Sequence, residues 1–98
     1  MSAADTLNKF RDSFARYLES DLKIEIPSAI KAVDNITFIQ FVRTYIKPYQ
    51  ESRNWSEGYE SLKNFIMMNG KTVPELSEGD EKKIVRYLEA FCEICDAV

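Results

Sequence analysis

The sequence contains no histidine, and this absence removes much of the familiar acid-base chemistry of enzymes. Histidine is the usual general base and the commonest metal ligand, because its charge changes near neutral pH. A Ser-His-Asp or Cys-His catalytic group therefore cannot form within one chain. A glycine-rich loop of the kind that cradles phosphates is also missing. We therefore expect no enzymatic activity and no cofactor.

Glycine, proline and cysteine are scarce, and long apolar runs are absent. Three glycines and three prolines among 98 residues leave little room for flexible linkers, so residues 1–98 are expected to form a single helical domain. Two cysteines are too few for a disulfide scaffold. The first residues lack the apolar core of a secretory signal, and the longest nearly uncharged run is too short to span a membrane. These absences predict an intracellular, cytoplasmic protein without membrane contact.

Positive charge is not concentrated anywhere along the chain. The formal net charge is −3, with +1 in residues 1–53 and −4 in residues 54–98. Proteins that bind duplex nucleic acid normally carry a dense basic surface, because phosphate neutralisation dominates their affinity. We therefore expect no duplex nucleic acid as a main partner.

The apolar residues recur mostly at helical spacing. A first stripe comprises Leu7, Phe10, Phe14, Tyr17 and Leu18 and predicts an amphipathic helix over residues 5–22. Residues 23–27 are interpreted as an extended connector, and the proline at position 27 can open a short helix over residues 27–33.

Three further helices are indicated by capping residues followed by apolar stripes. Asp34 can cap a helix that ends or kinks near Pro48, and Asn54 can cap a helix that ends at Gly70. The stretch between these two helices, residues 50–54, is the least regular. Ser77 begins the last helix, which follows a loop over residues 71–76. About four amphipathic helices with short connections predict an all-α fold, either a compact bundle or an orthogonal array.

The cysteine pair Cys92-Glu93-Ile94-Cys95 is the one local pattern that resembles a chemical site. Redox chemistry is disfavoured, because the pair lies near the C-terminus of its predicted helix, where the dipole opposes a thiolate. Zinc would need four ligands, so Cys92 and Cys95 could supply a site only by bridging two chains in a homodimer. Burial of both small side chains between helices is the interpretation we favour.

A partner-binding edge is the second candidate. Six aromatic residues fall between positions 38 and 59, and Tyr and Trp are favoured at protein interfaces. Basic residues alternate with tyrosines over residues 43–53, a pattern that could also bind single-stranded nucleic acid or an acidic ligand weakly. The predicted edge consists of Arg43, Tyr45, Lys47, Tyr49, Arg53, Trp55 and Tyr59.

These observations together predict a non-catalytic protein that acts by interaction or assembly, as a small helical adaptor or structural component. Its partner would be another protein or a second copy of the chain. Aromatic anchors would supply the buried surface, and the basic rim would set orientation and encounter rate. The zinc-bridged homodimer and the weak single-stranded nucleic-acid binder are the alternatives.

Overall fold

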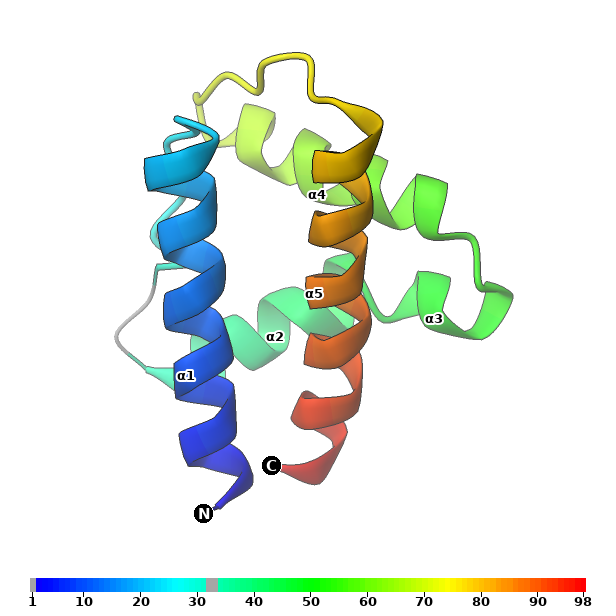
Figure 1. Ribbon diagram of the computed structural model, residues 1–98. Helices are drawn as coiled ribbons and strands as arrows, with labels where there is room; N and C mark the ends of the chain where they lie inside the picture. Colours follow the sequence, from blue (N-terminus) through cyan, green and yellow to red (C-terminus); the bar gives the residue numbers. More distant parts are fainter. Residues whose placement is uncertain (1, 32–33) are drawn as a thin grey trace.

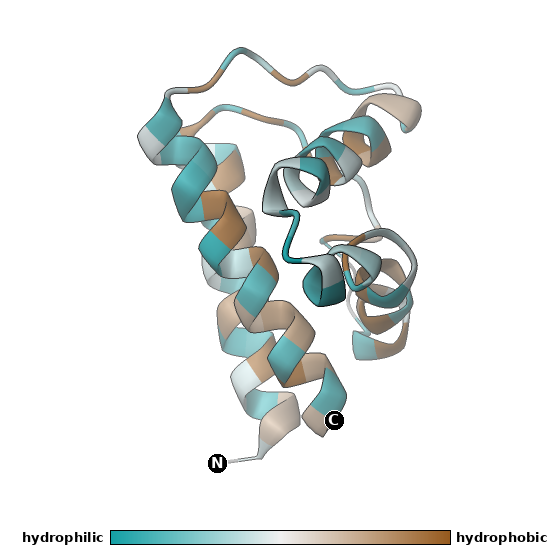
Figure 2. Ribbon diagram, turned by 90° about the vertical axis from the view of Figure 1, so that its right-hand side faces the viewer, coloured by the Kyte–Doolittle hydropathy of each residue, from teal (hydrophilic) through white to brown (hydrophobic). Residues whose placement is uncertain are grey.

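The computed structural model describes residues 2–31 and 34–98, and within these ranges the chain forms five α-helices and no strand. Helices α1 and α5 run antiparallel side by side, and α2 and α4 cross behind them (Figure 1). Hydrophobic and hydrophilic segments alternate along each helix, as expected for amphipathic helices packed on a common core (Figure 2). The predicted all-α array is thereby confirmed. The elements are α1 (Ala3–Arg16), its π-helical continuation η1 (Tyr17–Asp21), α2 (Asn35–Tyr45), α3 (Pro48–Ser52), α4 (Trp55–Met68) and α5 (Glu78–Ala97).

Helices α2, α4 and α5 begin directly after the capping residues predicted for them. The Asp34 carboxylate accepts the backbone N–H of Thr37 at 2.8 Å, which satisfies one of the free donors at the start of α2. Asn54 and Ser77 accept the N–H of the residue three positions further on, at 3.3 and 3.2 Å. Gly70, just after α4, has φ +80°, the left-handed conformation that glycine adopts without strain.

The first helix does not continue regularly over residues 5–22. It is α-helical to Arg16 and then passes into the π-helical turn, in which the N–H of Leu22 donates to the carbonyl of Tyr17, five residues back, at 3.1 Å. Residues 23–27 form a connector without helix or strand, but its first residue, Lys23, is left-handed with φ 58° and not extended as expected. Residues 28–30 form a turn rather than the predicted short helix over 27–33, and positions 32 and 33 lie outside the described residues.

The irregular stretch predicted at residues 50–54 is also partly helical. Pro48 occupies the first turn of α3, where its missing N–H costs no hydrogen bond. Arg53 then ends α3 with φ 54°, a left-handed conformation that turns the chain into α4. Of the end or kink predicted near Pro48, the structure shows an end: α2 stops at Tyr45, and α3 begins as a separate helix at Pro48.

The core is centred on Phe91 of α5, which is fully buried. Its ring lies edge-on to Phe14 of α1 and Phe38 of α2, with centroids 5.3 and 4.8 Å apart. Aromatic pairs in this geometry add stabilisation beyond the area that they bury. Phe91 therefore joins the three helices α1, α2 and α5 at one point.

The inner face of α1 differs from the predicted stripe at a single position. Phe10 was expected inside but is 40 % exposed, whereas the neighbouring Arg11 is 8 % exposed. The Arg11 guanidinium donates to the carbonyl of Asp34 at 3.1 Å and to the side-chain oxygen of Asn35 at 3.0 Å. It also lies 5.7 Å from the centre of the Phe38 ring. Arg11 thus fastens α1 to the start of α2, and these hydrogen bonds explain why a cation can be buried there.

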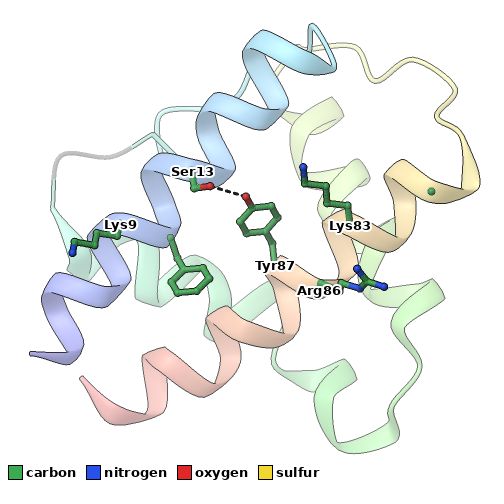
Figure 3. A pocket seen from close by; sticks show the side chains of 7 residues that line it. Lys9, Ser13, Lys83, Arg86 and Tyr87 are labelled. Atoms are coloured by element: carbon green, nitrogen blue, oxygen red, sulfur yellow. Dashed lines mark hydrogen bonds between the residues drawn. The ribbon is translucent and has the colours of Figure 1, made fainter. Parts of the chain in front are cut away.

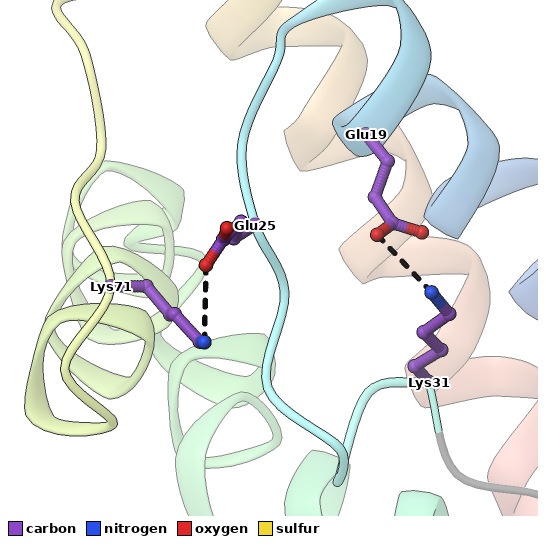
Figure 4. Close-up of polar contacts among 4 residues, drawn as sticks. All are labelled: Glu19, Glu25, Lys31 and Lys71. Carbon is purple, nitrogen blue, oxygen red and sulfur yellow. Dashed lines mark hydrogen bonds and ion pairs between the residues drawn. The ribbon is translucent and has the colours of Figure 1, made fainter.

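Two surface ion pairs hold the segment between η1 and α2 (Figure 4). Lys31 lies 3.3 Å from Glu19, and Lys71 lies 3.1 Å from Glu25. Exposed pairs of this kind contribute about 0–1 kcal/mol each, so burial of apolar side chains must supply most of the attachment. Those side chains are Ile24, Ile26 and Ile30.

Among the described residues, none of the helices combines the length and the apolar character needed to cross a bilayer.

Candidate functional site

The aromatic residues of the predicted edge differ in how much surface they offer. Tyr45 is half-buried, with its ring centroid 5.8 Å from that of Phe41 and 4.7 Å from that of Phe65. Tyr49 is also half-buried. Tyr59, in contrast, is 7 % exposed, and burial together with the charges of Glu81 and Glu60 raises its pKa. Tyr59 is therefore a core residue that contributes little to any edge.

Trp55 and Tyr49 both lie close to the backbone of Gly58, which has no side chain to keep them away. An ideal Cβ on Gly58 would lie 3.0 Å from a carbon of the Trp55 ring and 3.5 Å from the Cβ of Tyr49. The Trp55 ring also helps to line a hollow between α4 and α5. Glycine at this position thus allows α3 and the first turn of α4 to pack together.

The three cations of the predicted basic rim do not form one continuous rim. Lys47 forms an ion pair with Asp96 at the end of α5. Burial raises the pKa of Cys95, and the positive charges of Arg43 and Lys47 oppose that rise, so both cations lie near the last turns of α5. Arg53 ends α3, the helix that projects to the right in Figure 1. The cations therefore lie in two separate places.

A cleft is present instead between the α2–α3 segment and α4. We call it the α2–α4 cleft; its volume is about 320 Å³, and its lining residues are Tyr45, Tyr49, Glu57, Glu60, Ser61, Asn64, Phe65 and Met68. Met68 is 76 % exposed and the adjacent Met67 is 50 % exposed. Among the described lining residues, the charged side chains are the acids Glu57 and Glu60. The rim of this cleft is acidic, not basic.

The sequence predicted Tyr45 and Tyr49 as edge residues, together with Trp55 and Tyr59 of α4, but it did not predict the α4 residues that line the cleft. The lining residues of that helix fall at positions 57, 60, 61, 64, 65 and 68, which is helical spacing for a single face. This periodicity could have predicted that these α4 residues share one face. The sequence could not predict that Tyr45 packs against that face, because its contact with Phe65 depends on how α2 and α4 cross.

Cys92 and Cys95 lie in the core, 0 % and 2 % exposed, and both are free thiols. Burial raises the pKa of each thiol to about 11, despite the opposing effect of Lys47 on both and of Arg43 on Cys95. A raised pKa disfavours the thiolate that nucleophilic or metal-binding cysteines need. Within the described residues, no group of three or more histidine, cysteine or acidic side chains could hold a metal ion. The zinc-bridged dimer stays a prediction, and it would require both sulfur atoms to become exposed.

Comparison of the chain with protein-family models, with curated proteins and with solved structures finds no match.

Proposed function

We propose that this protein is a non-catalytic interaction subunit whose α2–α4 cleft receives a basic segment of another protein. The observation that carries the proposal is the combination of an aromatic, methionine-edged cleft with an acidic rim. Tyrosine is enriched among residues that dominate binding energy, and methionine adapts its shape to an apolar partner. Met68 is exposed to 76 %, so a partner that covered it would gain apolar burial.

The chemistry of the rim specifies the partner further. Glu57 and Glu60 stand on the same face of α4 as Phe65 and Met68. A partner segment would therefore place one apolar or aromatic side chain between Tyr45, Phe65 and Met68, and Lys or Arg beside the glutamates. Charges at an interface rim contribute mainly to orientation and encounter rate, whereas the central anchor contributes most of the affinity.

A selection from a random-peptide display library, with the wild-type protein as bait, tests this proposal. We expect enriched peptides to combine an aromatic or long aliphatic residue with flanking Lys or Arg. Titration calorimetry should show that Tyr49→Ala and Met68→Ser weaken their binding, and that Glu60→Lys weakens it most at low salt. Ile36→Ser is the matched control, because Ile36 is 70 % exposed but does not line the cleft.

Two outcomes would overturn the proposal. In the first, enriched peptides bind the Tyr49 and Met68 variants as well as they bind the wild type. In the second, sedimentation shows that the protein self-associates and that Met68→Ser abolishes this association, which would make a second copy the occupant of the cleft.

A further inference from the structure

A larger hollow lies on another face, between the antiparallel helices α1 and α5. We call it the α1–α5 groove; its volume is about 750 Å³, and its lining residues are Lys9, Phe10, Ser13, Gly79, Lys83, Arg86 and Tyr87. Figure 3 shows Lys9 and Ser13 projecting from α1 on one side and Lys83, Arg86 and Tyr87 from α5 on the other. Sites for small molecules commonly have volumes of about 300–1,000 Å³, so this groove has the size of a ligand site.

The groove has an aromatic wall whose geometry is fixed. The hydroxyl groups of Tyr87 and Ser13 are hydrogen-bonded at 2.7 Å, which links α5 to α1 across the groove. The Tyr87 ring packs against Phe14, with centroids 5.1 Å apart. Phe10 is 40 % exposed, an unusual position for phenylalanine in a chain whose other five phenylalanines are buried or half-buried. Two aromatic side chains are therefore available to a flat apolar group.

The charged side chains that line the groove are all cations. The chain has 16 acidic and 13 basic residues, yet Lys9, Lys83 and Arg86 are the charged residues among the described lining residues. A smaller adjoining hollow of about 260 Å³ shares Lys83 and adds Arg16, with Asp21 as the acid on its lining. A concave site with one sign of charge concentrates ligands of the opposite sign.

The Asp80 carboxylate of α5 is engaged by two hydroxyl groups. Asp80 accepts a hydrogen bond from the Tyr17 hydroxyl at 2.6 Å and from the Ser77 hydroxyl at 3.0 Å. Lys83 lies over the Tyr17 ring, 4.2 Å from its centre, and this contact holds the ammonium group near the groove.

From this placement we infer that the α1–α5 groove binds a small aromatic anion, such as an aryl phosphate. The aromatic ring packs against Phe10 and Tyr87, and the anionic group lies between Lys83 and Arg86. Arginine and lysine both bind phosphate, arginine through paired N–H donors and lysine as a point charge. A neutral aromatic ring would contact only the aromatic wall of the groove, and a small anion would contact only its cations, so a ligand that carries both groups should bind best. This site is separate from the α2–α4 cleft and does not depend on the proposed interaction function.

Amide chemical shifts measured with three matched probes test the inference. The probes are 1-naphthyl phosphate, neutral 1-naphthol and inorganic phosphate. We expect 1-naphthyl phosphate to shift the amides of residues 9–13 and 83–87 and to saturate at a lower concentration than either other probe. Added salt should weaken its binding, because screening reduces the attraction between exposed charges.

Variants then identify the cations involved. Lys83→Gln and Arg86→Gln should each lower the affinity for 1-naphthyl phosphate about 1.5- to 5-fold, the range expected for exposed ion pairs. Phe10→Ser should also lower this affinity, but without changing its dependence on salt. Lys82→Gln is the matched control for Lys83→Gln, because it removes the same charge from the same helix but does not line the groove; Lys82 lines the hollow beside Trp55, which Arg86 borders as well. The inference is wrong if 1-naphthyl phosphate binds no more tightly than phosphate, if the shifted amides scatter over the surface, or if Lys82→Gln weakens binding as much as Lys83→Gln.

Discussion

The reactivity of Cys92 and Cys95 provides a quantitative test of their place in the core. Both side chains are at most 2 % exposed, and both thiols have a pKa of about 11 instead of the ordinary value of 9.0. Disulfide reagents react with the thiolate, so the reaction requires both ionisation and access. The structure opposes both requirements.

The size of the effect follows from these two requirements. At about pH 8 a pKa higher by two units lowers the thiolate fraction about 100-fold. Access sets a separate upper limit, because a reagent reaches a buried sulfur only when the structure opens, and the thiols of the unfolded chain have their ordinary pKa. For a domain with about 5 kcal/mol of stability, the globally unfolded fraction is about 10⁻⁴, so the slowing could reach about 10,000-fold. We expect the native protein to react between about 100-fold and 10,000-fold more slowly than the unfolded chain.

The assay is the reaction with Ellman's reagent in native buffer and in concentrated urea. Ile36→Cys supplies an internal control, since Ile36 is 70 % exposed and its thiol should react rapidly beside two slow ones. Two thiols that react at the unfolded rate in native buffer would refute the core placement. Slow reaction that becomes fast on addition of a chelator, together with one zinc per two chains, would favour the zinc-bridged dimer instead.

Three further predictions concern stability. Burial raises the pKa values of Tyr17 and Tyr59 above the ordinary value of 10.0, so above about pH 10 the unfolded chain ionises while the folded protein does not; the urea midpoint should therefore fall as the pH rises above about 10. Gly58→Ala places a Cβ 3.0 Å from the Trp55 ring, so it should shift tryptophan fluorescence and destabilise the fold by about 1–3 kcal/mol in urea unfolding. Ser77→Ala removes the acceptor at the start of α5 and should cost about 1 kcal/mol by the same measurement, whereas Ser77→Asp should cost much less.

Features fixed by neighbouring residues could be predicted from the sequence. Asp34, Asn54 and Ser77 each act on an N–H only three positions away, so their capping roles are visible in a short window. The burial of Cys92 and Cys95 followed from the apolar stripe of the last helix. All-α architecture needed no more than these stripes and short connections.

Features that depend on distant residues could not be predicted. Arg11 is buried because Asp34 and Asn35, more than twenty residues further on, accept its hydrogen bonds. Phe10 is exposed because the neighbouring Arg11 takes the inner position at this turn, whereas the other residues of the predicted stripe are buried. The α2–α4 cleft and the cationic α1–α5 groove both combine residues from separate helices, and helical periodicity does not specify which faces meet.

The π-helical turn over Tyr17–Asp21 also determines how the chain tolerates changes in length. A π turn contains about one residue more than an α turn, and one residue corresponds to about 100° of helical rotation. Deleting a residue there would let α1 continue as an ordinary helix, but the chain would leave it in a different direction. The following segment would then carry Ile24, Ile26 and Ile30 away from the core, although no buried side chain had been altered. At this turn the number of residues matters more than their identity, so single deletions should be far more damaging than substitutions of its exposed positions, Ser20 and Asp21.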